Sequence, residues 1–144
     1  MRCVDVNVLV YAHRADLPQH HDYRRLLERW SNDEEPMGLA DAVLSGFLRV
    51  MTNRRIFNEP TTLEQAWQAV DDLIAAPAAM RLRAGERHWA IFRGLSTEVG
   101  ALGNDVADAY LAAYAVEHNA SWLSADRGFA RFPRLRYRHP LEAD

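Results

Sequence analysis

The chain has 144 residues, of which 49% are hydrophobic and 26% are charged, and its formal net charge is -3. This length suits one compact domain over residues 1–144, and the hydrophobic content is too high for a disordered chain. Because no apolar run approaches the roughly 20 residues of a membrane span, no leader peptide is indicated and Cys3 is the single cysteine, we expect a soluble cytoplasmic protein with no membrane contact.

In the first half of the chain, apolar periodicity predicts one strand followed by helices. Residues 2–6 have the pattern of a short buried strand, and residues 7–13 continue apolar and are predicted to begin a helix at once. Large apolar side chains recur at helical spacing over 19–30, and they do so again over 40–52 after a polar turn at 31–36.

In the second half of the chain, strands and helices alternate. A doubled capping-box pattern at 61–65 predicts a helix over 62–75, and Asn104 is predicted to cap another helix after a turn. The remaining elements are predicted as a strand at 79–83, helices at 86–98 and 105–118, and strands at 121–125 and 135–138. Short strands separated by helices predict a three-layer α/β/α fold with a short, mainly parallel central sheet.

Two aspartates lie at the carboxyl ends of predicted strands of this sheet. Asp5 interrupts the apolar run CVDVNVLV, and Asp126 comes directly after the strand at 121–125. Ligands of parallel sheets bind outside the carboxyl ends of the strands, which is where both carboxylates should lie. Aspartate is also common as a helix N-cap and in turns, so each residue taken alone fits a structural role as well.

A third aspartate, Asp108, leads a stripe of small apolar residues on the predicted helix over 105–118. The residues three, four and seven positions further on are leucine or alanine, so this stripe should face the sheet. Asp105 lies one turn earlier on the same side. The helix dipole stabilises a first-turn acid by ~0.3–1 kcal/mol, but it poorly explains an acid at the head of a buried stripe. We therefore interpret Asp108 as functional.

Asp5, Asp108 and Asp126 are thus expected to converge at one edge of the sheet. Crowded carboxylates repel one another, and a bound divalent cation is the usual compensation, with Mg²⁺ or Mn²⁺ suited to an all-oxygen site. Such sites orient a water and stabilise displacement at phosphate. We predict these three aspartates as catalytic, metal-binding residues, with Asp105 as an additional candidate acid.

The C-terminal segment is basic and contains several aromatic residues. Residues 127–140 hold five arginines and no acid, whereas residues 1–126 carry 18 acids against 12 arginines. Arginine binds phosphate and aromatic rings stack on the bases of single-stranded RNA, although the same aromatic residues also fit a hydrophobic core. Arg127 and Arg131 are candidate RNA contacts, and Arg49 belongs to a second basic patch.

The segments around these aspartates resemble PIN-domain ribonucleases, most closely the VapC-type toxins of bacterial type II toxin–antitoxin modules. The resemblance rests on VDVNVLVYA at 4–12, GFLRV at 46–50, DAYLAA at 108–113 and SADRGFARF at 124–132. It implies a PIN-like α/β/α domain with Mg²⁺- or Mn²⁺-dependent endoribonuclease activity on an RNA such as transfer or ribosomal RNA.

The same resemblance implies a homodimer that a small cognate antitoxin neutralises. By position in the motifs, it implies that Asp5, Asp108 and Asp126 are the metal-binding acids. It also implies that Asn7 supports Asp5 through a hydrogen bond.

Two positions depart from the pattern of that family. Gly46 stands where a glutamate is usual, and Gly128 stands where another acid often follows the last aspartate. Asp41 lies about 140° away from Gly46 around an ideal helix and is a poor substitute. The shortage of carboxylates leaves an alternative open, a catalytically weak PIN-like module that binds RNA or antitoxin. A phosphatase on another α/β fold would need an Asp-x-Asp motif, and residues 5–7 are Asp-Val-Asn.

Overall fold

The computed structural model describes residues 1–143. Within this range a five-stranded, fully parallel sheet forms the centre of the molecule, with the strand order β3-β2-β1-β4-β5. The strands are β1 (Arg2–Val4), β2 (Met37–Ala40), β3 (Ala79–Leu82), β4 (Ser121–Leu123) and β5 (Arg136–Arg138). Since β2 and β3 lie on one side of β1 and β4 and β5 on the other, the strand order switches at β1, and a crevice is expected at its carboxyl end.

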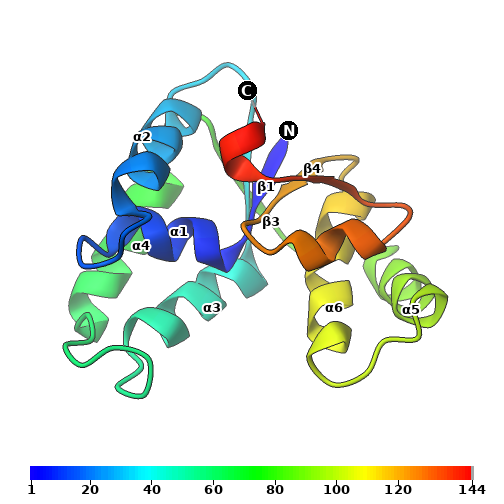
Figure 1. Cartoon of the computed structure of the whole chain (residues 1–144). Helices are drawn as coiled ribbons and strands as arrows, with labels where there is room; N and C mark the ends of the chain where they lie inside the picture. The colour runs from blue at the N-terminus through cyan, green and yellow to red at the C-terminus, as the bar shows by residue number, and fades with distance from the viewer. Residues whose placement is uncertain (144) are drawn as a thin grey trace.

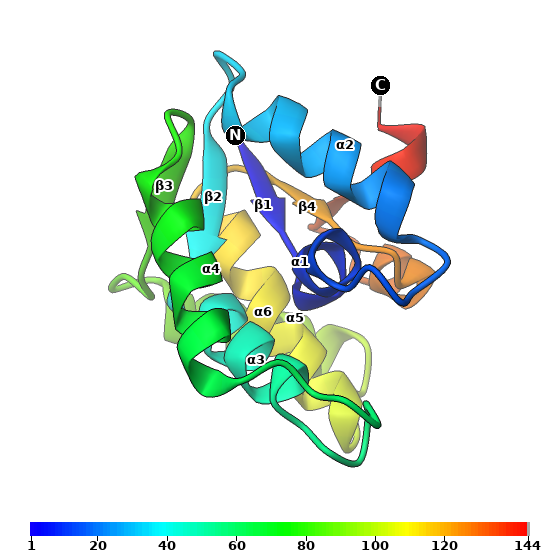
Figure 2. The same ribbon diagram turned by 90° about the vertical axis from the view of Figure 1, so that its left-hand side faces the viewer.

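Helices cover both faces of this sheet. Helices α1 (Val6–His13), α2 (His20–Ser31) and α4 (Leu63–Ala75) lie on one side, and α5 (His88–Glu98) and α6 (Asn104–Glu117) lie on the other (Figure 1). Helix α3 (Asp41–Met51) contacts α1 and α4, and the 3₁₀ helices η1 (Arg127–Arg131) and η2 (Pro140–Glu142) flank β5. Figure 2 views the strands from the side of α1, α2 and α4. The predicted three-layer α/β/α fold is confirmed.

Strand β2 is missing from the sequence prediction, which has a polar turn at 31–36 and a helix from residue 40. Met-Gly-Leu-Ala is too short to show a period, and glycine is a weak strand former. All four residues are buried between β1 and β3, and a Cβ added at Gly38 would lie 2.8 Å from Leu82 Cδ1. Burial and pairing with neighbouring strands, rather than local preference, make this segment a strand.

The predicted start of helix α4 is correct, whereas helix α6 begins one residue earlier than predicted. Thr62 caps α4 in a full capping box, in which Thr62 Oγ1 accepts from Gln65 N at 3.2 Å and Gln65 Oε1 accepts from Thr62 N at 3.3 Å. The predicted N-cap at Asn104 is wrong, because Asn104 is the first residue of α6 and Gly103 precedes it at a φ of 57°. Glycine adopts this positive φ without the steric clash of a Cβ.

None of the helices within residues 1–143 combines the length and the apolar character that crossing a bilayer requires.

Candidate active site

Asp5 follows β1 directly and caps the N-terminus of α1. Its Oδ1 accepts a hydrogen bond from Val6 N at 2.7 Å, and the residue is only 5% exposed. The pKa of Asp5 rises to about 6, chiefly because burial removes water from the carboxylate. Hydrogen bonds from Ser124 and Val6 oppose this rise, and the charges of Asp108 and Asp126 add to it. Asp5 is therefore an N-cap whose charge is costly to keep.

Ser124, the residue directly after β4, connects the polar groups around Asp5. Its Oγ donates to Asp5 Oδ2 at 2.6 Å and accepts from Asn7 Nδ2 and from Asp126 N, both at 3.0 Å. Asn7 also donates to Asp5 Oδ2 at 3.3 Å and accepts from Ala125 N at 3.1 Å. Asn7 therefore makes the hydrogen bond to Asp5 that the resemblance implies. Ser124 is not among the residues predicted from sequence, although a polar residue directly after a buried strand, two positions before Asp126, is a usable signal.

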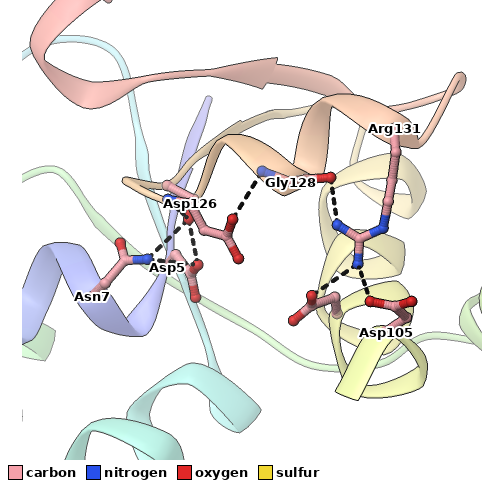
Figure 3. Close-up of polar contacts among 8 residues, drawn as sticks. Asp5, Asn7, Asp105, Asp126, Gly128 and Arg131 are labelled. Carbon is pink, nitrogen blue, oxygen red and sulfur yellow. Dashed lines mark hydrogen bonds and ion pairs between the residues drawn. The ribbon is translucent and has the colours of Figure 1, made fainter. Parts of the chain in front are cut away.

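Asp126 begins η1 as its N-cap. Its Oδ1 accepts a hydrogen bond from Gly128 N at 2.8 Å, and Ser124 Oγ holds its backbone N–H. In the view of Figure 3 its carboxylate lies between Asp5 and the pair formed by Asp105 and Arg131. Asp126 therefore has the turn-capping role that is common for aspartate. In this turn its carboxylate is directed toward the other acids.

Helix α6 contributes Asp105 and Asp108, one turn apart on the same side. Arg131, the last residue of η1, binds both carboxylates, with Nη2 lying 3.1 Å from Asp105 Oδ1 and 2.9 Å from Asp108 Oδ2. The side chain of Asp108 is 26% exposed and that of Asp105 is 52% exposed. An arginine therefore compensates the charge of both acids.

Asp5, Asp108 and Asp126 line one cleft of about 1210 Å³ at the carboxyl ends of β1 and β4. The oxygen-only donor set suits Mg²⁺ or Mn²⁺, and a cation beside Asp5 would offset the cost of its buried charge. Among residues 1–143, however, no three Asp, Glu, His or Cys side chains lie close enough to hold one ion together. The residues fit a divalent cation by their chemistry, while in this arrangement Arg131 holds Asp108.

The two glycines at positions where the resemblance would place acids lie close to neighbouring side chains. A Cβ added at Gly46 would lie 2.9 Å from Val6 Cγ2, because α1 and α3 pack closely there. A Cβ at Gly128 would lie 2.9 Å from both Asp126 Oδ1 and Arg131 Nη1. Asp41, already a poor substitute by sequence, pairs instead with Arg81 at 2.7 Å.

The basic and aromatic residues of the C-terminal segment have separate roles. Phe129 and Phe132 are each 1% exposed and belong to the core, so their rings are not free to stack on bases. The side chain of Arg127 is 63% exposed and pairs with Glu142 at 2.5 Å. Arg49 is exposed in the last turn of α3. Arg127 and Arg49 are thus accessible cations, whereas Arg131 faces the acids.

The fold agrees with the comparison to known families. Residues 2–135 match the family model described as the PIN domain. The chain therefore belongs to the PIN-domain family.

Its relatives define a group within that family. Ribonuclease VapC43 of Mycobacterium tuberculosis is 72% identical over 142 residues, covering 99% of this chain and 97% of that protein. Ribonuclease VapC25 of the same species is 39% identical over 140 residues, covering 97% of this chain and 99% of that protein. Within the PIN-domain family, the chain belongs to the VapC ribonucleases.

Solved structures share the fold at low sequence identity. VapBC2 from Rickettsia felis, bound to a DNA fragment from its promoter, has a TM-score of 0.71 at 20% identity and covers 96% of this chain and 97% of its own. VapC20 of Mycobacterium tuberculosis, described as a sarcin–ricin loop cleaving toxin, has a TM-score of 0.65 at 16% identity. The match covers 94% of this chain and 99% of that chain.

Proposed function

We propose that this VapC-type ribonuclease is a divalent-metal-dependent endoribonuclease, the toxin of a type II toxin–antitoxin module, that cleaves a structured RNA such as transfer or ribosomal RNA. The observation that carries the proposal is that three carboxylates, from the segments after β1 and β4 and from α6, line one cleft. A buried carboxylate with a pKa of about 6 next to two further acids is costly unless a cation compensates it. That arrangement favours metal-assisted hydrolysis of a phosphodiester.

Asp5, Asp108 and Asp126 are the proposed metal-binding and catalytic residues, with Asp105 as an additional acid. A divalent ion held by these residues would polarise a water and stabilise negative charge at the phosphate. Asn7 and Ser124 act through Asp5, because their hydrogen bonds hold Oδ2 in one orientation.

The substrate is proposed to bind along the same cleft. Its lining continues from the acids along α1 to Tyr11 and Arg14 and to the segment 56–59, so it is longer than the acid site alone. Arg49 and Arg127 are exposed and are the proposed phosphate contacts of a bound RNA. Because the net charge of the chain is -3, the protein as a whole does not attract nucleic acid, and RNA binding would depend on these local arginines.

The proposed partners are a small cognate antitoxin and a second copy of the chain. The solved relatives include a VapBC complex, which supports an antitoxin partner. Exposed apolar residues support self-association, with Trp89 69%, Leu102 81% and Val106 39% exposed on or beside α5 and α6. Since the proposed target RNA is cytoplasmic, so is the proposed compartment.

A second candidate function is that of a PIN-like module that binds RNA or antitoxin but hardly cleaves. The observation that favours it is the pairing of Arg131 with Asp105 and Asp108, together with Gly46 and Gly128 at positions where the family usually has acids. In this alternative the cleft would hold a ligand without hydrolysing it.

RNA cleavage by the purified protein tests the proposal. We expect cleavage with Mg²⁺ or Mn²⁺, loss of cleavage with EDTA, and a loss of at least about 100-fold in Asp5→Asn and Asp126→Asn. Asp41→Asn is the matched control, because it removes the same charge from an exposed carboxylate that pairs with Arg81. Cleavage that persists in EDTA would refute metal dependence. Growth arrest that survives undiminished in both variants, while the wild type cleaves no RNA at any metal concentration, would establish the binding module.

A further inference from the structure

Arg131 makes four contacts at the edge of the acid site. Its Nη2 lies 3.1 Å from Asp105 Oδ1 and 2.9 Å from Asp108 Oδ2, and its Nη1 donates to the carbonyl oxygen of Gly128. The guanidinium also lies over the ring of Phe132, 4.6 Å from the centroid. Figure 3 shows the guanidinium directed from η1 across to α6.

These contacts make Arg131 a fixed cation rather than a mobile surface side chain. Its side chain is 30% exposed, and it rests on Phe132, which is itself 1% exposed and part of the core. Its Nε is buried without a hydrogen-bond partner among residues 1–143. A guanidinium that leaves one donor unsatisfied while it binds two carboxylates indicates that the attraction to the acids determines its position.

Gly128 leaves the space that this arrangement needs. A side chain at that position would begin 2.9 Å from Arg131 Nη1, closer than a real Cβ approaches a neighbour. The backbone of Gly128 instead serves both neighbours, since its N–H binds Asp126 and its carbonyl binds Arg131. Gly128 therefore contributes to this arrangement through its backbone, which contacts both the last aspartate and the arginine.

We propose that Arg131 is the internal counter-cation of the acid site, which holds Asp105 and Asp108 while no metal is bound and releases Asp108 when a divalent ion binds. This inference rests on the metal dependence of the proposed function. Arg131 is a positioning residue, because it orders the carboxylates of α6 and competes for one of them. Its removal should therefore have two opposite effects, a less stable metal-free protein and tighter metal binding.

Binding of Mn²⁺ to the full chain, measured by calorimetry at low ionic strength, tests this competition. Since the two ion pairs are partly exposed, we expect Arg131→Gln to bind Mn²⁺ about tenfold more tightly than the wild type. Arg134→Gln is the matched control, because it removes the same charge from the same C-terminal segment but from a side chain paired with Glu98. The affinity of the control variant for Mn²⁺ should stay within about twofold of the wild-type affinity.

Thermal unfolding separates competition from a merely structural role. In EDTA, Arg131→Gln should unfold at a lower temperature than the wild type, and saturating Mn²⁺ should raise its unfolding temperature more than that of the wild type. Arg131→Lys keeps the positive charge and should return Mn²⁺ affinity toward the wild-type value. It also keeps the test usable if the glutamine variant fails to fold, because lysine lacks the forked guanidinium and should compete less well for the acids. Tighter binding of Mn²⁺ by Arg131→Lys than by Arg134→Gln would then support the proposal, and equal affinity would oppose it.

The outcomes distinguish this inference from the proposed function. If the wild type binds Mn²⁺, Asp5→Asn abolishes binding, and Arg131→Gln binds no more tightly than the wild type, the counter-cation is refuted and the metal site stands. If neither the wild type nor Arg131→Gln binds Mn²⁺ at any concentration, the metal dependence of the proposed function fails and the counter-cation fails with it.

Discussion

Replacing Asp5 by asparagine should stabilise the metal-free protein at neutral pH. The pKa of Asp5 is about 6 in the folded protein, against an ordinary value of 3.8. Between these values the folded state binds a proton that the unfolded state has lost, so stability falls as pH rises through this window. Above pH ~6 the folded protein carries the full loss of stability from ionised Asp5, and a pKa difference of about two units corresponds to roughly 3 kcal/mol of unfolding free energy.

The local hydrogen bonds reduce this gain. The new carboxamide keeps an oxygen for Val6 N, but it presents an NH₂ group to Ser124 Oγ, which already accepts from Asn7 and from Asp126 N. Such a mismatch costs about 1–2 kcal/mol. Asp5→Asn should therefore be more stable than the wild type by about 1–2 kcal/mol at pH 7, a rise of roughly 3–6 °C in Tm for a chain of this size.

The measurement is urea unfolding in EDTA between pH 4 and pH 8, followed by circular dichroism. Toward pH 4 the variant should become the less stable protein, because wild-type Asp5 is then protonated in the folded state and only the hydrogen-bond mismatch remains. The two stability curves should therefore cross. Asp41→Asn controls for the change in net charge. A difference of constant size across the whole range, or a variant that is less stable at pH 7, would refute the reasoning.

Three further predictions concern the surroundings of the site. Ser124→Ala should destabilise the fold by about 1–3 kcal/mol in urea unfolding, because it removes the partner of Asp5 and of two donors, and a loss below about 0.5 kcal/mol would contradict that role. Gly46→Ala should cost about 1–3 kcal/mol through its contact with Val6, and the added change Val6→Ala should recover part of this, whereas purely additive losses would argue against the contact. Arg14→Gln should speed hydrogen exchange over 54–60, since Arg14 binds the Glu59 carbonyl at 2.8 Å and stacks 3.9 Å from the Phe57 ring centroid; unchanged exchange would contradict this.

Local signals in the sequence were sufficient for most helices. The capping box at Thr62 and Gln65 predicted the start of α4, because its hydrogen bonds join residues three positions apart. The aspartates were recognisable for a related reason, since a carboxylate within an apolar run or at the head of an apolar stripe is unexpected. Strand β2 was not recognisable, because its strand character depends on burial between β1 and β3.

The sequence by itself determined most helical segments and the α/β/α class, and it predicted the three aspartates that line the cleft, since these depend on periodicity, capping and buried charge within short stretches. Only the tertiary structure decided how the site is compensated. Ser124 and Asp5 bind each other across 119 positions, and Arg131 reaches Asp105 and Asp108 across 26 and 23 positions. Contacts over such distances have no local pattern, because the packing of η1, α6 and the sheet brings these side chains together.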